Sequence, residues 1–389
     1  MLIFYLILIS TTIISALGCY FYSQKIRPIS TVTGDVENTN LKRSISLFFA
    51  IASFFLMIFL ISYRSSYGDT YLYIKTFDNV SNDLADIKPI IESKSDSKGF
   101  DILQILFKCF ISDNYTVWFA FLAIFSAGAI IKVYYEHSIN FTMSAFLFVT
   151  SGAFTWLMNG TRQFLAVCLI LYGFNYLVKR KTVRFILIVL IATTIHASAI
   201  LWIPIYFIVI LKPWSKGIWL CVFATVLVIF FLDQFTSILD DSLQGTMYEG
   251  VGSMMNGYVM EDGTVDDGVN PIRLFISAVP AAIAFWRKKQ VAEYEDRVIN
   301  ICINLSVVGT CIYLLGIFTS GIMVGRLPIY FTLTNYILLP WLIDKTLDNN
   351  SKSFIKIMCY LLYFLYFYYS YDMSGVGDYK SDKLGLYYH

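Results

Sequence analysis

Four arginines stand at the ends of long apolar runs, where a permanent positive charge needs a partner. Arg162 is the clearest case, because it lies between two apolar runs in the stretch TWLMNGTRQFLAVCLILYGF. A guanidinium stays charged at any working pH, and placing it at mid-membrane costs at least about 2.5–3.5 kcal/mol unless something pairs with it. Arg64, Arg273 and Arg326 occupy similar positions. Guanidinium forks match phosphate oxygens, so these arginines are candidates for binding a phosphate-bearing anion.

Two further residues could take a proton beside such an anion. His196, in the sequence THAS, titrates near the working pH and is the first candidate for a general base, or it could donate to phosphate as a neutral imidazole. Asp69, in GDTY, is the second candidate. Arg326 and Tyr330 are four residues apart and would share one face of a helix, which makes Tyr330 a candidate for lining the site.

Simpler interpretations of the same residues stay open. An arginine at a helix end often extends to the lipid headgroups, which is the leading interpretation of Arg273. A single buried histidine is often a satisfied core residue, and Asp69 could simply cap the helix that follows it. Each candidate therefore needs a neighbour of matching chemistry before it counts as part of a site.

The composition is that of an integral membrane protein. Of 389 residues, 57% are apolar, 17% are aromatic and only 14% are charged, whereas a soluble domain carries about a quarter charged residues. The net charge of +2 gives no sign of nucleic acid as a partner. Seven cysteines form no CxxC pair and there are three histidines, so we expect buried apolar cysteines and neither a metal nor another cofactor.

Ten apolar runs are long enough to cross a membrane as helices, at about 16–21 residues each. Because backbone in lipid must be internally hydrogen-bonded, the fold class is an all-α polytopic bundle. The first run has no basic residue before it, which predicts a retained helix with its N-terminus outside. The runs are Leu2–Tyr22, Ser44–Ser62, Tyr115–Lys132, Phe141–Leu157, Gln163–Val178, Gly217–Leu232, Pro271–Trp286, Val298–Phe318, Gly325–Ile343 and Phe354–Tyr371.

The remaining apolar segment, Thr182–Leu211, would be ~45 Å long as one helix, which is too long for an upright span. If it crosses once, every later loop violates the rule that basic loops stay inside. If it turns near His196, the basic loops at 179–184, 212–216 and 287–289 all lie inside. We therefore predict a hairpin of two half-length helices, buried among other helices, and about 12 helical segments in total.

This topology makes 1–389 a single polytopic membrane domain with three notable segments outside its helices. The segment 63–114 is an extracytoplasmic loop with an amphipathic helix, 233–270 is an extracytoplasmic loop with eight acidic residues and no Lys or Arg, and 372–389 is a C-terminal tail. The four arginines, His196 and Asp69 then lie at the outer ends of helices. We expect them to face one cavity that opens outward and binds a lipid pyrophosphate, with a glycan as the acceptor.

Five stretches of the sequence resemble, in order, the EpsG-like branch of the Wzy-type polysaccharide polymerases. They are RSSYGDTYLYIKTF, GFDILQILFKCF, NGTRQFLAVCLILYGF, IHASAILWIPIYF and GRLPIYF, and the similarity extends over residues 60–345. The most specific parts are Arg-Gln followed by Ala, the basic turn after it, and His-x-Ser-Ala. Gln163 and Ser198 lie in these motifs and are expected to line the substrate site. The tail SGVGDYKSDKLGLYYH is the least familiar part, and nothing is carried over to it from the family.

The resemblance implies an enzyme of the bacterial cytoplasmic membrane with a fold of the GT-C-like membrane glycosyltransferase class. It would join oligosaccharide repeat units carried on undecaprenyl pyrophosphate into O-antigen, capsule or exopolysaccharide, with membrane lipid around it. A chain-length regulator and a flippase of the same pathway are implied as further partners. Arg162, Arg326, Arg273 and Arg64 would stabilise the pyrophosphate leaving group, and the lack of a DxD-type motif predicts no obligatory metal.

Two other classes remain as alternatives. A ligase-type transferase would move a whole glycan to a different acceptor with similar arginine chemistry. A transporter or flippase for lipid-linked oligosaccharides would be expected to show internal repeats, and none is found in the sequence.

Overall fold

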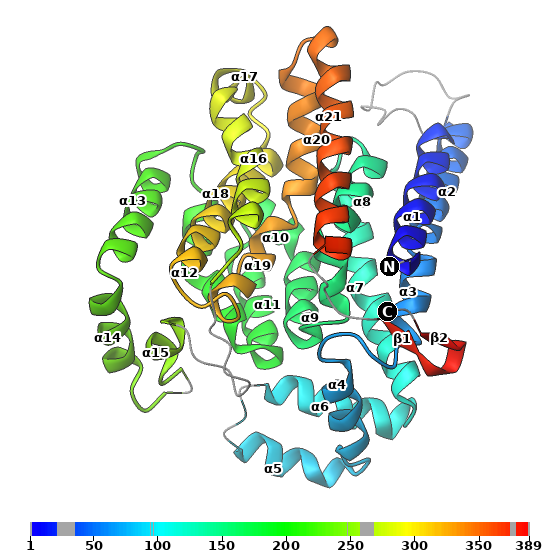
Figure 1. The fold of residues 1–389 in the computed structure, drawn as a ribbon, viewed down its shortest axis with the longest axis vertical. Helices are drawn as coiled ribbons and strands as arrows, with labels where there is room; N and C mark the ends of the chain where they lie inside the picture. Colours follow the sequence, from blue (N-terminus) through cyan, green and yellow to red (C-terminus); the bar gives the residue numbers. More distant parts are fainter. Residues whose placement is uncertain are drawn as a thin grey trace. The chain divides into compact units, whose positions relative to one another are not determined.

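The computed structural model describes residues 2–21, 36–93, 95, 97–246, 248–256, 268–373 and 379–387, and nearly all of them are helical (Figure 1). Contacts divide the chain into two compact units. The first unit comprises Met1–Phe174, Thr194–His196 and Leu347–His389, and the second comprises Asn175–Thr193 and Ala197–Thr346. The predicted class, an all-α membrane protein, is confirmed as far as helix content and apolar helices can show it.

The first unit is built from α1 to α9 and α21. Its helices are α1 (Leu2–Phe21), α2 (Val36–Ala52), α3 (Phe55–Ser62), α4 (Thr70–Asn79), α5 (Ile87–Glu92), α6 (Lys98–Phe110), α7 (Tyr115–His137), α8 (Phe141–Thr150), α9 (Thr161–Tyr172) and α21 (Asn349–Tyr368), with short helical turns at Leu84–Asp86, Ala153–Leu157, Tyr369–Met373 and Asp382–Leu384. The strands β1 (Lys380–Ser381) and β2 (Leu386–Tyr387) form an antiparallel pair near the C-terminus.

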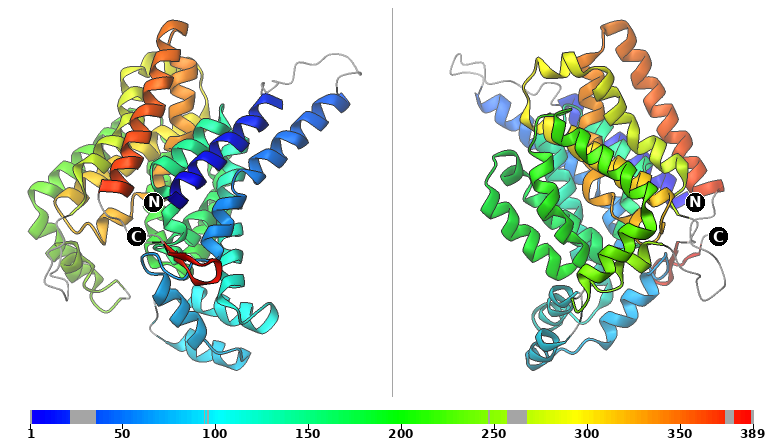
Figure 2. Two further views of the ribbon diagram at one scale, coloured as in Figure 1. Left: turned by 45° about the vertical axis from the view of Figure 1, so that its right-hand side comes forward. Right: turned by 90° about the vertical axis from the view of Figure 1, so that its left-hand side faces the viewer.

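The second unit begins within α10 (Phe174–Val178) and contains α11 to α20, apart from the last two residues of α11. Its helices are α11 (Thr182–Ile195), α12 (Trp202–Val209), α13 (Lys216–Phe230), α14 (Leu232–Leu243), α15 (Val251–Met255), α16 (Pro271–Trp286), α17 (Lys288–Ala292), α18 (Arg297–Ile317), α19 (Ile329–Thr332) and α20 (Asn335–Thr346), with 3₁₀ turns at Ala197–Leu201 and Val324–Arg326. The views in Figure 2 follow these helices through the same colours.

Within the described residues, four helical stretches are long and apolar enough to cross a membrane: Leu2–Tyr20, Arg43–Ser62, Tyr115–His137 and Arg297–Ile317. A fifth span is possible in length if α13 and α14, which meet at 99°, are taken together. The predicted count of about 12 segments is therefore not confirmed. One reason is that apolar runs are broken: in the run Phe141–Leu157 the α-helix ends at Thr150, Gly152 adopts a φ of 80°, and a 3₁₀ turn follows.

The predicted hairpin around His196 is present. Helix α11 ends at Ile195, the chain turns, and α12 runs back beside it. The ring of Phe185 in α11 lies 5.4 Å from Trp202 and 5.5 Å from Tyr206, and the hydroxyls of Thr182 and Tyr206 are 2.6 Å apart. The earlier residue of α11, Thr182, contacts the later residue of α12, Tyr206, whereas Phe185 contacts Trp202. This order defines an antiparallel hairpin, as the distribution of basic loops predicted.

The segment 63–114 packs as helices against α7 in the first unit. Trp118 of α7 is fully buried, and its ring lies 5.6 Å from Phe77 in α4, 5.7 Å from Phe100 and 4.9 Å from Phe107 in α6. Burying aromatic rings against one another in this way fixes both helices, because each ring removes a large apolar area from solvent. The expected amphipathic helix is α6, whose Phe100, Ile105 and Phe107 are buried.

The described part of the acidic segment 233–270 also contains helices. Asp240 in α14 holds the start of α15, because its carboxylate accepts hydrogen bonds from the backbone N–H of Gly252 at 2.6 Å and of Ser253 at 2.8 Å. Residues 257–267, which carry four of the eight acidic side chains, lie outside the described residues.

The C-terminal strands are tied to the first unit close to Arg64. Lys380 forms a β-bridge with Ser66, and its carbonyl accepts from the N–H of Ser65 at 2.8 Å. The Tyr379 hydroxyl donates to the carbonyl of Leu60 at 2.7 Å. The described part of the tail is therefore a packed element of this unit.

Candidate functional site

Arg162 lies in the first turn of α9, directly after a tight turn. Gly160 has a φ of 77°, and a Cβ at that position would lie 2.8 Å from the Trp156 ring, so the turn requires glycine. The Nη1 of Arg162 donates to the Oγ of the buried Ser97 at 2.9 Å. The first N–H groups of a helix and its dipole attract anions, so the charge of Arg162 and the start of α9 reinforce each other.

Asp69 lies next to this turn in the first unit. Its neighbour Gly68 has a φ of 48°, and a Cβ there would lie 2.8 Å from Cγ of Asn159, three residues before Arg162. Asp69 occupies the position before α4, yet its side chain accepts no capping hydrogen bond from that helix. The structure therefore does not support the interpretation of Asp69 as a simple helix cap.

The segment that carries His196 also meets this region of the first unit. A Cβ at Gly99, in the first turn of α6, would overlap the side chain and backbone of Thr194, two residues before His196. Gly99 in turn is two residues from Ser97, the partner of Arg162. The start of α6 thus lies between the segments of Arg162 and His196. Gln163 is buried in α9 beside Arg162.

Arg64 lies deeper in the first unit and is 1% exposed. Its Nη1 donates to the carbonyl of Ile61 at 2.6 Å, its Nε donates to Oγ1 of Thr70 at 3.1 Å, and its guanidinium lies 3.8 Å from the centre of the Phe119 ring. Burial lowers the pKa of Arg64 to about 9, which still leaves it charged at neutral pH. Its binding of pyrophosphate stays a prediction.

The segments of Arg326 and Arg273 lie side by side in the second unit. Arg326 ends the turn Val324–Arg326, and a Cβ on the preceding Gly325 would lie 2.5 Å from Cγ2 of Val269. The N–H of Val269 donates to the carbonyl of Gly316 at 2.7 Å, which ties the chain before α16 to the end of α18. Arg273 is the third residue of α16 and is exposed.

Tyr330 and Ser198 meet in the same unit. The Ser198 hydroxyl donates to the Tyr330 hydroxyl at 3.1 Å, and the Tyr248 hydroxyl donates to the carbonyl of Ala197 at 3.3 Å. The prediction that Arg326 and Tyr330 share one continuous helix is wrong, because the chain forms a 3₁₀ turn ending at Arg326 and a separate helix α19.

Sequence reasoning missed three residues that these contacts identify: Ser97, Asn159 and Tyr248. Ser97 directly precedes α6, so a serine before an amphipathic pattern was the available signal. Asn159 stands in the NG pair before Arg162, which is typical of a turn. Tyr248 carried no signal, because its role depends on a contact 51 residues away.

Replacing Gly68 by alanine is expected to destabilise the protein more than replacing Gly385 by alanine. Both glycines have a positive φ, at 48° and 62°, so both substitutions carry the backbone cost of about 1–2 kcal/mol. Only the Gly68 substitution also collides with Asn159, while a Cβ on Gly385 meets nothing within 4 Å. Thermal unfolding of the two variants in detergent measures the difference, and equal midpoints would contradict the contact.

The described residues contain no group of three or more His, Cys, Asp or Glu side chains placed to hold a metal ion. The absence of an obligatory metal stays a prediction, which a chelator added to a turnover assay can test.

Comparison with known proteins identifies the family. No curated protein and no solved structure matches the chain. A model of the EpsG family matches residues 47–381, which include every candidate residue described above and segments of both units. The match extends over most of the 389 residues and agrees with the resemblance seen in the sequence motifs, which indicates a membrane protein of polysaccharide synthesis. The chain belongs to the EpsG family.

Proposed function

We propose that this protein polymerises oligosaccharide repeat units carried on undecaprenyl pyrophosphate, at the outer face of the bacterial cytoplasmic membrane. The observation that carries the proposal is the family match over residues 47–381, since EpsG membership indicates a polysaccharide polymerase. The position of Arg162 at the start of α9 adds a site suited to an anionic leaving group.

The reaction breaks the bond between the sugar C1 and the oxygen of the pyrophosphate. A hydroxyl of the acceptor glycan attacks C1, the carrier leaves as undecaprenyl pyrophosphate, and the hydroxyl proton passes to a base. Negative charge grows on the leaving phosphate, so Arg162 and Arg326, together with Arg273, would stabilise the transition state. One preorganised donor of this kind contributes roughly 3–4 kcal/mol. Arg64 is the fourth arginine predicted to bind the pyrophosphate, and its burial would keep its positive charge in a fixed position.

His196 is the first candidate for the base and Asp69 is the second. Gln163, Ser198 and Tyr330 would line the bound glycan. In this assignment the hydrogen bond between Ser198 and Tyr330 sets the position of both hydroxyls before substrate arrives.

Replacing His196 by glutamine separates proton transfer from hydrogen bonding. Glutamine keeps a donor and an acceptor but cannot take a proton near neutral pH, so we expect turnover to fall by about 10²–10⁴-fold. The remaining turnover should no longer change with pH in the range in which a histidine base would titrate. Full activity of His196→Gln, with an inactive Asp69→Asn variant, would transfer the role of the base to Asp69.

The decisive experiment supplies purified protein with the native repeat unit on its lipid carrier and separates the products by size. A ladder of polymers with free undecaprenyl pyrophosphate supports the proposal. Transfer of single glycans to another acceptor without a ladder would point to a ligase. Movement of the intact substrate across a vesicle membrane without bond cleavage would point to a transporter.

A further inference from the structure

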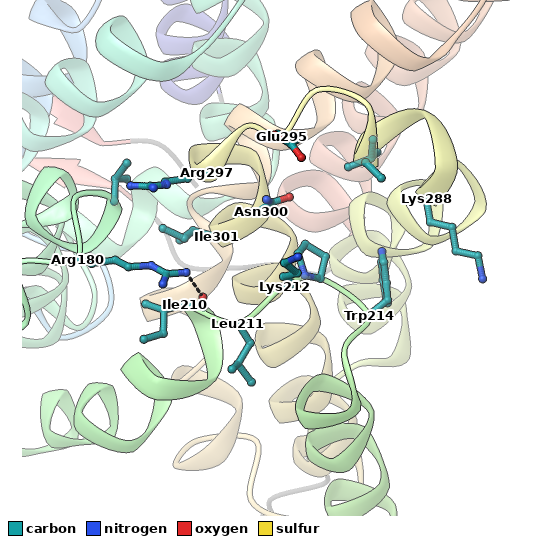
Figure 3. Close-up of a pocket in the computed structure, with 14 residues that line it drawn as sticks. Arg180, Ile210, Leu211, Lys212, Trp214, Lys288, Glu295, Arg297, Asn300 and Ile301 are labelled. Atoms are coloured by element: carbon teal, nitrogen blue, oxygen red, sulfur yellow. Dashed lines mark hydrogen bonds between the residues drawn. The ribbon is translucent and has the colours of Figure 1, made fainter.

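A cavity of about 440 Å³ lies within the second unit, and none of the four arginines proposed to bind pyrophosphate lines it. Three turns form it: the turn before α11, the turn between α12 and α13, and the turn between α17 and α18. Its lining includes four cations and one carboxylate, Arg180, Lys212, Lys288, Arg297 and Glu295. Figure 3 shows Arg180 and Arg297 on one side, Lys288 on the other, and Lys212 between them. Volumes of 300–1,000 Å³ are typical of small-molecule sites.

Unusual backbone conformations gather at this cavity. Among the described residues, the non-glycine residues with positive φ are Arg180 at 53°, Trp214 at 60° and Glu295 at 44°. All three line the cavity, one from each turn. A left-handed conformation costs a residue with a Cβ about 1–2 kcal/mol, and such costs persist mainly at functional sites. Strain in all three turns therefore indicates a ligand-binding function for the cavity.

The walls of the cavity are held by specific contacts. Arg180 donates to the carbonyl of Ile210 at 2.9 Å, and the buried Asn304 of α18 donates to the carbonyls of Val209 at 3.0 Å and Leu211 at 2.8 Å. The Trp214 ring packs 5.0 Å from Phe285, and its Nε1 is buried without an acceptor in the described structure. These contacts fix the turn at 209–214, so the cavity is preformed.

The cavity and the segment of Arg326 lie at opposite ends of α18. Arg297 begins this helix, whereas Gly316, at its other end, holds the chain beside Arg326. The helix has 21 residues, which corresponds to about 31 Å and is close to the thickness of the hydrocarbon layer. The cavity is thus far from Arg326 and is a separate site within this unit.

We propose that this cavity binds an organic phosphate, with the phosphate held by Arg180, Lys212 and Arg297 and the organic part against Trp214 and the aliphatic wall. Four cations against one carboxylate leave an excess of three positive charges, and arginine forks match phosphate oxygens. Basic cavities between membrane helices suit the headgroups of anionic phospholipids, while a soluble phosphate ester offers the same chemistry. This proposal does not depend on the polymerase reaction.

The test compares three compounds added to protein purified in a neutral detergent: short-chain phosphatidylglycerol, glycerol 3-phosphate and short-chain phosphatidylcholine. The readout is the thermal unfolding midpoint as a function of concentration, since a ligand of the folded state raises it. We expect phosphatidylglycerol, glycerol 3-phosphate or both to raise the midpoint, and phosphatidylcholine to have less effect. Stabilisation by glycerol 3-phosphate at equal concentration identifies a soluble ligand, and stabilisation by phosphatidylglycerol alone identifies a lipid.

Two matched double variants show whether the cavity is responsible. Lys212→Gln with Arg297→Gln removes two cations that line the cavity, and we expect the concentration for half-maximal stabilisation to rise at least about tenfold. Lys216→Gln with Lys179→Gln removes two exposed cations that do not line it, and should leave that concentration unchanged. Both variants are checked for an unchanged midpoint without ligand. Equal loss in both variants, equal stabilisation by phosphatidylcholine, or no stabilisation by any compound would overturn the proposal.

Discussion

Replacing Arg162 by alanine is expected to abolish long polysaccharide chains while the protein still inserts into the membrane. Arg162 lies in the first turn of α9, and its guanidinium donates a hydrogen bond to Ser97. The charge is therefore fixed before substrate binds. Loss of one preorganised donor costs roughly 3–4 kcal/mol, which corresponds to a turnover lower by about 10²–10³-fold. Gel electrophoresis of the surface polysaccharide and the purified assay both measure this loss.

Arg162→Lys refines the same prediction. Lysine keeps the charge but lacks the planar fork, so turnover should fall less than with alanine yet stay well below that of the native protein. Arg184→Ala is the matched control, because Arg184 is an exposed arginine of α11 whose guanidinium lies 5.8 Å from the centre of the Tyr176 ring. A normal ladder from Arg162→Ala, or equal loss in the Arg184→Ala control, would refute the role of Arg162.

Replacing Arg326 by alanine is expected to have an effect of the same size. Gly325 packs against Val269, which fixes the turn that carries Arg326. Four residues after Arg326, Tyr330 accepts a hydrogen bond from Ser198. The backbone N–H groups of Val324 and Gly325 also donate to the carbonyl of Ser320 at 3.0 and 3.2 Å, so we expect the variant to keep its unfolding midpoint. Lys289→Ala, an exposed cation of α17, serves as the control in this unit.

The double variant of Arg162 and Arg326 tests whether both act on one diphosphate. Residues that stabilise the same leaving group behave as a unit, so their losses do not multiply. We expect the turnover of the double variant to lie within about tenfold of that of the less active single variant. Fully multiplicative losses would assign the two arginines to independent steps.

The positions of basic residues predicted the hairpin better than hydropathy predicted the spans. Topology is set by a few charges near helix ends, and the charges around 179–184, 212–216 and 287–289 all required a turn at His196. Hydropathy does not specify where a helix breaks. The break after Thr150 and the separation of the turn at Arg326 from α19 depend on glycine conformations and tertiary contacts, so single helices were predicted there.

The candidate site could be predicted in its residue types but only partly in its contacts. Arg162 and Arg273 do lie in first turns of helices, as the sequence indicated. The burial of Arg64 against Phe119 could not be read from a pattern, because the two residues are 55 positions apart in the chain. For the same reason the basic turns were interpreted only as topology signals, whereas the structure assembles three of them into one cavity.

The pairing of Lys380 with Ser66 has a practical consequence for anyone who shortens or tags this protein. Cutting the chain after residue 373 would remove β1, which pairs with Ser66, and would leave the carbonyl of Leu60 without the hydrogen bond from Tyr379. That carbonyl belongs to the same helical turn whose Ile61 carbonyl accepts from Arg64, so the damage would reach a buried cation. Expression vectors should therefore retain residues 379–387.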